Sequence, residues 1–128
     1  MTQEEKELLL KDLCARLPYN VKVKVECGDI PYAPTILSKL DIKRKVALFN
    51  FEVRIENCKP YLRPMSSMTE EEKKEFSVLA VGTHLFKGPL IPSYDTLDWL
   101  NSHHFDYRGL IDKGLAIEVT EKNNPYKE

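Results

Sequence analysis

The alternation of apolar and polar residues from Val46 to Glu56 constrains the fold of this chain more than any other feature. A period of two places successive side chains on opposite faces of a strand, so the pattern predicts a long strand with one buried and one hydrated face. The buried face is expected to carry Phe49, Phe51, Val53 and Ile55, and the hydrated face Asn50, Glu52, Arg54 and Glu56. Val21–Cys27 alternates in the same way, Thr35–Leu40 is a further predicted strand, and Asp41–Lys45 is a predicted polar turn. Because the connections are short, we expect these strands to pair antiparallel as a small meander.

Two helices are predicted from capping boxes, in which a threonine hydroxyl and a glutamate carboxylate satisfy backbone amides reciprocally. The first box is Thr2–Glu5, and the apolar stripe that follows it ends at Pro18, which cannot continue a helix. The second box is Thr69–Glu72. It opens a helix that is expected to end near Gly82, with a strand over Val78–Leu85 as the alternative.

The rest of the chain alternates between short elements and irregular connections. Cys58–Met65 is expected to be an extended connection without regular structure, because its two prolines fix φ and remove amide donors. Asp95 is expected to cap a short helix, and Asp106 a further turn or two. Leu115–Val119 alternates again and predicts a final short strand. The predicted fold class is therefore α+β, with a small antiparallel sheet packed against an N-terminal helix and further short helices in the C-terminal half.

The length and composition favour one domain. A chain of 128 residues with 42% hydrophobic residues can bury an ordinary core without help from disulfides or a metal. No repeat or linker divides the sequence, so we expect a single domain over residues 1–128. Residues 121–128 are polar and are expected to form a frayed tail.

Charge, hydropathy and cysteine usage indicate a soluble cytoplasmic protein. The 19 Lys and Arg residues nearly balance the 20 Asp and Glu residues, for a net charge of -1. The longest apolar runs have four residues, which is too few for a membrane helix, and the N-terminal residues lack the pattern of a signal peptide. The three cysteines are widely spaced without a C-x-x-C pair, as expected for free thiols in a reducing compartment.

Three stretches carry a resemblance to a known family. Lys59–Glu72, His103–Glu118 and Lys11–Pro18 resemble blocks in a family of small uncharacterised proteins of anaerobic gut bacteria. Such proteins are often associated with prophages and other mobile elements. The matching stretches cover about a third of the chain. The resemblance implies a genomic setting, but it supplies no catalytic residue and no cofactor.

The candidate binding residues gather in one region of the C-terminal half. Tyr and Arg side chains suit the recognition of planar and anionic groups, and a glycine permits close approach of a partner backbone. The alternative is structural: Asp106 caps the next turn, Arg108 pairs locally and Tyr107 packs. The candidate binding surface comprises Trp99, His103, His104, Asp106, Tyr107 and Arg108.

The same region contains ligand types suited to a divalent metal. His103, His104 and Asp106 are the candidates for a metal-dependent enzyme. Adjacent residues on a helix point about 100° apart, so one helix cannot easily present both histidines to one ion. The sequence also lacks the phosphate-loop, dinucleotide, nucleophile-elbow and zinc-protease motifs. We therefore expect no metal, no cofactor and no catalytic residue, and keep the metal-dependent enzyme as a further alternative.

A basic cluster offers a second functional reading. Residues 39–63 carry seven basic against three acidic residues, which would suit a phosphate-binding face. The cluster sits at a predicted hairpin turn and has no run of exposed aromatic residues to stack on bases. The nucleic-acid alternative rests on Lys39, Lys43, Arg44 and Lys45.

The leading functional hypothesis is a non-enzymatic accessory or interaction protein of phage or mobile-element origin. It rests on the missing catalytic motifs and on the resemblance described above. The expected partner is another protein, with nucleic acid as the alternative and no membrane.

Overall fold

The computed structural model describes residues 1–27, 30–31, 34–48, 52–84 and 94–127. Its larger sheet has five strands in the order β2-β1-β7-β8, with β3 also pairing to β1. Every pairing in this sheet is antiparallel except the parallel pairing of β7 with β8. The strands are β1 (Lys22–Cys27), β2 (Ile30–Pro31), β3 (Thr35–Ile36), β7 (Cys58–Leu62) and β8 (Ile117–Glu118).

The smaller sheet is a three-stranded antiparallel meander of β4 (Lys39–Asp41), β5 (Val46–Leu48) and β6 (Glu52–Arg54). The single long strand expected over Val46–Glu56 is therefore wrong, because β5 and β6 pair with each other and Ile55–Asn57 forms the 3-10 helix η2. An antiparallel hairpin preserves an alternation of period two, so the pattern alone does not reveal the reversal. The prediction that Phe49 and Phe51 are buried and Asn50 is hydrated concerns residues outside the described part of the chain.

The prediction for Cys58–Met65 is also wrong, since β7 is the strand between β1 and β8. Pro60 lies opposite Val23 of β1, while β8 pairs only with Tyr61 and Leu62 of β7. Pro60 therefore has a strand neighbour on one side only, a position where a missing amide donor is tolerated. After β7 the chain passes through the short 3-10 helix η3 (Met65–Ser67).

Helix α1 (Gln3–Arg16) shares a hydrophobic core with residues of both sheets. The predicted capping box is present, with Thr2 and Glu5 bonded reciprocally, and the 3-10 helix η1 (Leu17–Tyr19) follows. Leu9 and Leu13 of α1 are fully buried. They belong to a core cluster with Val21, Val23, Val25, Leu37, Ala47, Val53, Ile55, Cys58, Leu62, Leu110, Leu115 and Ala116.

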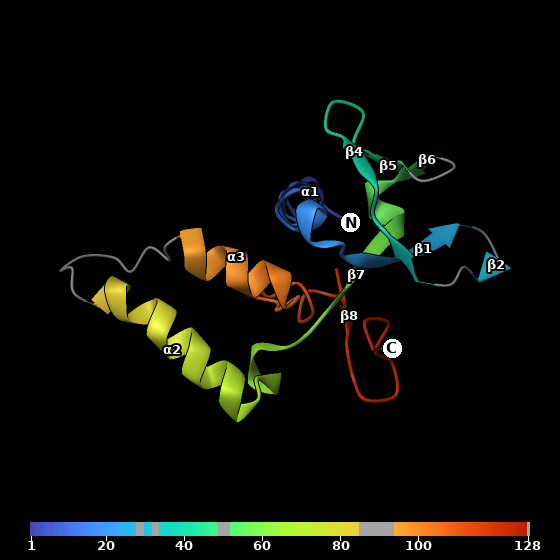
Figure 1. Cartoon of the computed structure of the whole chain (residues 1–128). Coiled ribbons are helices and arrows are strands. Elements are labelled where there is room, and N and C mark those ends of the chain that lie inside the picture. The colour runs from blue at the N-terminus through green and yellow to red at the C-terminus, as the bar shows by residue number, and fades with distance from the viewer. Residues whose placement is uncertain (28–29, 32–33, 49–51, 85–93, 128) are drawn as a thin grey trace.

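Helices α2 (Glu70–His84) and α3 (Tyr94–Ser102) lie side by side and extend away from the sheets (Figure 1). The second capping box is also confirmed, because Thr69 and Glu72 bond reciprocally. The helix continues past Gly82, so the alternative strand is wrong. Helix α3 begins at Tyr94, which places Asp95 in its first turn rather than at the cap.

The chain is a small α+β protein whose C-terminal residues are anchored. We name residues 119–127 the C-terminal strap. The Tyr126 hydroxyl donates to the Tyr61 carbonyl at 2.8 Å and accepts from the Lys22 amide at 2.9 Å. Within the segment predicted to fray, the half-buried Tyr126 thus ties the chain to β1 and β7. None of the helices in the described part of the chain is long and apolar enough to cross a membrane.

Candidate functional site

The end of α3 positions the two candidate histidines. The Phe105 amide donates to the Leu100 carbonyl at 3.0 Å, and the His104 amide donates to the Asn101 carbonyl at 3.1 Å. These two bonds form a Schellman motif, which requires a left-handed residue after the helix and usually takes glycine there. His104 occupies that position with φ of 63°. The histidine pair is thus split at the helix end, and the two rings enter different surroundings.

His103 lies in an aromatic and ionic cluster between α2 and α3. Its ring packs against Trp99 at 4.3 Å between centroids, and its Nδ1 lies 3.4 Å from Glu72 Oε2. Arg63 donates two bonds of 2.7 Å to the Glu72 carboxylate. These bonds hold the pKa of Glu72 at about 2, against an ordinary value of 4.5. Trp99 Nε1 adds a bond of 3.0 Å to Glu75, so this cluster fastens α2 to the rest of the protein.

Asp106 caps the turn that follows α3. Its two carboxylate oxygens accept from the amides of Leu110 and Ile111, each at 2.9 Å. The side chain is 8% exposed, so both oxygens are directed at backbone donors rather than at solvent. The geometry is the capping role weighed in the sequence analysis as the structural alternative.

Tyr107 and Arg108 belong to a buried ionic network with α1. Asp12 accepts from Arg16 Nε at 2.8 Å and from Arg108 Nη1 at 3.0 Å, and the side chains of Asp12 and Arg16 are fully buried. Arg16 Nη2 also donates to the Phe105 carbonyl at 2.6 Å. The Tyr107 ring lies beneath both guanidinium groups, at 5.1 Å from Arg16 and 4.9 Å from Arg108. Asp12 and Arg16 are four residues apart on α1, a spacing that is equally common for surface ion pairs, so no local signal reveals their burial.

His104 packs beneath the C-terminal strap. Its ring stacks on Tyr126 with 3.8 Å between centroids and 8° between planes. Burial lowers the pKa of His104 to about 4, and the positive charge of Arg16 acts in the same direction. The imidazole is therefore neutral at physiological pH.

The six predicted residues thus contribute to four separate sets of contacts. Tyr107 and Arg108 belong to the network with Asp12 and Arg16. His103 faces Glu72, His104 faces Tyr126, and Asp106 faces backbone amides. Among the described residues there is no group of three or more His, Cys, Asp or Glu side chains placed to hold a metal ion.

The cysteines for which side chains are described are poor nucleophiles. Burial raises the pKa of both Cys14 and Cys58, that of Cys58 to about 12. A thiol with such a pKa is protonated at neutral pH, and the thiolate is the reactive form.

The basic residues at the β4–β5 hairpin differ in whether their charges are paired with a carboxylate. Arg44 donates bonds of 2.7 and 2.6 Å to the Glu52 carboxylate, and its amide donates to Asp41 at 3.1 Å. These contacts raise the pKa of Arg44 and lower that of Glu52. Within the described ranges, Lys39 and Lys43 form no ion pair.

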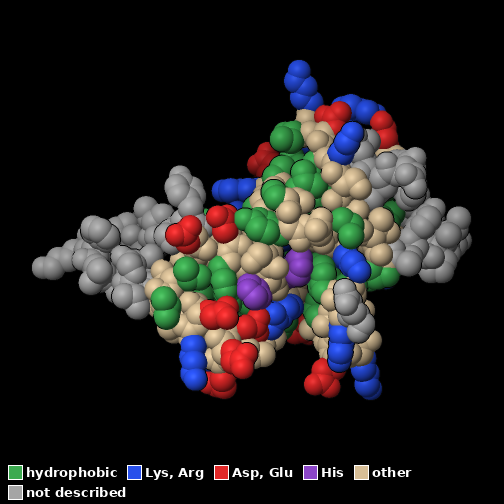
Figure 2. Space-filling view, in the orientation of Figure 1, with side chains coloured by type: hydrophobic (Ala, Val, Ile, Leu, Met, Phe, Trp, Pro, Cys, Tyr) green, Lys and Arg blue, Asp and Glu red, His purple; other side chains and the backbone are tan. Residues whose placement is uncertain are grey.

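An open groove lies beside this hairpin, and we name it the hairpin groove. It encloses about 500 Å³ and is lined by Leu17 and by the six consecutive residues Ser38–Lys43. Ile42 is 63% exposed at its rim, and Leu40 is half-buried within it. Figure 2 shows hydrophobic side chains gathered on this face near the hairpin, with Lys and Arg side chains beyond them. This surface is not predicted from the sequence, although an isoleucine in an otherwise polar turn is a local signal for it.

Comparison with protein-family models, with curated proteins and with solved structures finds no match, so the functional argument rests on the residues of this chain.

Proposed function

We propose that the protein is a non-enzymatic interaction protein that binds a segment of another protein in the hairpin groove. The observation that carries the proposal is the exposure of Ile42, which lines this groove together with the apolar side chains of Leu17 and Leu40. An exposed isoleucine in a turn adds nothing to the core. Its apolar surface contributes free energy only when a partner covers it and removes it from water.

The charges at the groove indicate the chemistry of the partner. Lys39 and Lys43 line the same groove and form no ion pair within the described part of the chain. A partner that inserts apolar side chains and presents Asp or Glu at the edges would satisfy both features. Such charge complementarity speeds encounter and selects against wrong partners.

The nucleic-acid alternative has weaker support. Of its four basic residues, Arg44 is already paired with Glu52 by two bonds. The groove beside the hairpin is lined by aliphatic rather than aromatic side chains, whereas single-stranded nucleic acid is bound by stacking on aromatic rings. Protein binding is therefore the better-supported function.

The sequence resemblance supports an accessory role of this kind. Lys59–Glu72 and His103–Glu118 resemble proteins associated with prophages and other mobile elements. An accessory protein that acts by covering a surface of another protein needs a docking groove and no catalytic centre.

A random-peptide display library selected on the immobilised protein tests the proposal. We expect the enriched peptides to combine aliphatic residues with Asp or Glu. Ile42→Lys should weaken their binding about tenfold to thirtyfold, because covering an exposed isoleucine contributes about 1.5–2 kcal/mol. Reversal of Lys39 and Lys43 to Glu should weaken binding further and invert its dependence on salt, because the like charges then repel and salt screens the repulsion.

Val78→Lys is the matched control. Val78 is 74% exposed on α2, away from the groove, so the same change of chemistry there should leave peptide binding intact. Peptides without acidic residues, or peptides that bind Ile42→Lys as tightly as the unmodified protein, would contradict the proposal.

A further inference from the structure

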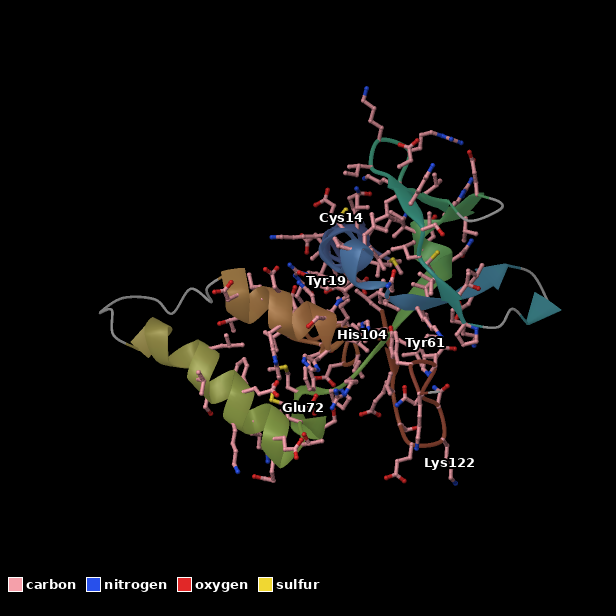
Figure 3. All side chains as sticks on the ribbon, in the orientation of Figure 1. Cys14, Tyr19, Tyr61, Glu72, His104 and Lys122 are labelled. Atoms are coloured by element: carbon pink, nitrogen blue, oxygen red, sulfur yellow. The ribbon has the colours of Figure 1, made fainter. Side chains whose placement is uncertain are left out.

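The C-terminal strap is held to the protein chiefly by one aromatic residue. The Tyr126 ring lies flat on His104, and its hydroxyl reaches the main chains of β1 and β7. Figure 3 labels His104 and Tyr61 close to the point where α3, β7 and the C-terminal residues meet. Tyr126 thus fills a pocket with an aromatic wall and a main-chain floor that offers one donor and one acceptor.

Two buried polar atoms, one of them in the His104 ring that stacks on Tyr126, have no partner among the described residues. Arg16 Nη1 and His104 Nδ1 are buried and make no hydrogen bond with the described residues. The His104 ring, which carries one of these atoms, is stacked on Tyr126. The state with the strap closed therefore carries the cost of a buried polar atom without a partner.

The rest of the strap is lightly attached. At its base the Val119 amide donates to the Leu62 carbonyl at 2.8 Å, and near its end Lys22 Nζ donates to the Pro125 carbonyl at 2.6 Å. Between these points an open cleft of about 370 Å³ separates the strap from Arg63 and Ser67. Lys122 lies at the outer turn of the strap (Figure 3). Release of Tyr126 would therefore free most of the segment.

We propose that the pocket filled by Tyr126 is a binding site for a small planar phenol, and that the C-terminal strap is its displaceable internal occupant. A phenol reproduces both functions of the Tyr126 hydroxyl, since it accepts from the Lys22 amide and donates to the Tyr61 carbonyl. A carboxylate would leave the Tyr61 carbonyl without a donor. The neutral His104 ring supplies the stacking surface.

Binding of p-cresol to the full-length protein, followed by calorimetry and by the NMR signals of His104, tests this proposal. We expect p-cresol to bind the unmodified protein, and to bind Tyr126→Ala about tenfold more tightly because the internal competitor is gone. Toluene lacks the hydroxyl and 4-methylanisole cannot donate, so both should bind more weakly than p-cresol. Tyr19→Ala is the matched control, because Tyr19 is a half-buried tyrosine bonded to Asp98 at another place.

Displacement has its own readout in proteolysis. Lys122 is exposed but lies in a segment tied down at both ends, so trypsin cleavage after it reports local opening. We expect p-cresol to accelerate this cleavage in the unmodified protein and to leave cleavage at Lys73 and Lys74 of α2 unchanged.

Two outcomes would overturn the proposal. One is p-cresol binding to Tyr126→Ala alone, which would mean that the substitution created the cavity. The other is binding to the unmodified protein without faster cleavage at Lys122. If Tyr126→Ala does not fold, Tyr126→Phe tests the proposal instead, because it keeps the ring and removes both hydrogen bonds of the hydroxyl. The proposal then requires p-cresol to bind Tyr126→Phe more tightly than it binds the unmodified protein.

Discussion

Asp12→Asn should destabilise the protein severely, although it replaces only one carboxylate oxygen with an amide nitrogen. Asp12 is the carboxylate that Arg16 and Arg108 share, and the side chains of Asp12 and Arg16 are fully buried. The substitution keeps the shape but leaves the Arg16 guanidinium buried without a counter-charge. Removing one partner of a buried pair costs about 3–5 kcal/mol, a large part of the total stability of a domain of this size.

Urea unfolding followed by fluorescence of Trp99, the one tryptophan of the chain, measures this loss. With a typical denaturant dependence, the midpoint should fall by roughly 1.5–3 M. Glu52→Gln is the matched control, because it removes a carboxylate from an equally short pair with Arg44 that is exposed. Its midpoint should stay near that of the unmodified protein.

A double variant separates the charge from the packing. Asp12→Leu with Arg16→Met removes both buried charges and keeps similar volumes, so it should recover much of the stability lost in Asp12→Asn. The reasoning is refuted if Asp12→Asn loses less than about 1 kcal/mol. It is refuted equally if the double variant is no more stable than the single one.

Three further predictions concern the contacts of Glu72, His104 and Asp106. Glu72→Gln should lower the free energy of unfolding by about 1–2 kcal/mol at pH 7. The pKa of Glu72 is about 2 in the folded state and 4.5 ordinarily, so the stabilisation by its carboxylate is present above pH 4.5 and is lost as pH falls toward 2. The urea midpoints of the variant and of the unmodified protein should therefore converge at low pH. The pKa of His104 is about 4 in the folded state and 6.5 ordinarily, so the unfolded state takes up the proton first and stability falls as pH drops from 6.5 toward 4. His104→Asn should remove that pH dependence, because asparagine does not titrate and adopts the left-handed conformation readily. Asp106→Ala should cost about 2 kcal/mol in thermal unfolding because two buried amides lose their acceptor, whereas Asp112→Ala, an exposed aspartate, should cost little.

The elements predicted from the sequence were accurate where the signal is local. Both capping boxes, at Thr2 and Thr69, form as expected, because such a box involves residues three apart in one segment. The polar turn after Asp41 is also present. The errors in the strands, including the division of the predicted strand Thr35–Leu40 into β3 and β4, arise because strand pairing is not a local property. Alternation reports which face a residue occupies, but it reports neither where the chain reverses nor which strand becomes its neighbour.

Pro60 illustrates such an error. Taken alone, a proline argues against a strand, since it cannot donate to a neighbour. Here β8 ends its pairing with β7 beside Tyr61, so β1 is the only neighbour of Pro60 among the described strands. That arrangement depends on residue 117, far along the chain, and no window around Pro60 contains it.

The sequence by itself determined the α+β class, the starts of the helices that carry capping boxes, and the apolar faces of α1 and β1, because these follow from spacings of two to four residues. Only the tertiary structure decided that Asp12 and Arg16 are buried, that Tyr126 fills a pocket, and that Ile42 stands beside an apolar groove. Arg16 meets the Phe105 carbonyl across 89 residues, and Tyr126 meets Lys22 across 104. Such contacts form when separate elements pack together, and the chemistry of each residue is compatible with both a surface and a buried position until its neighbours are known.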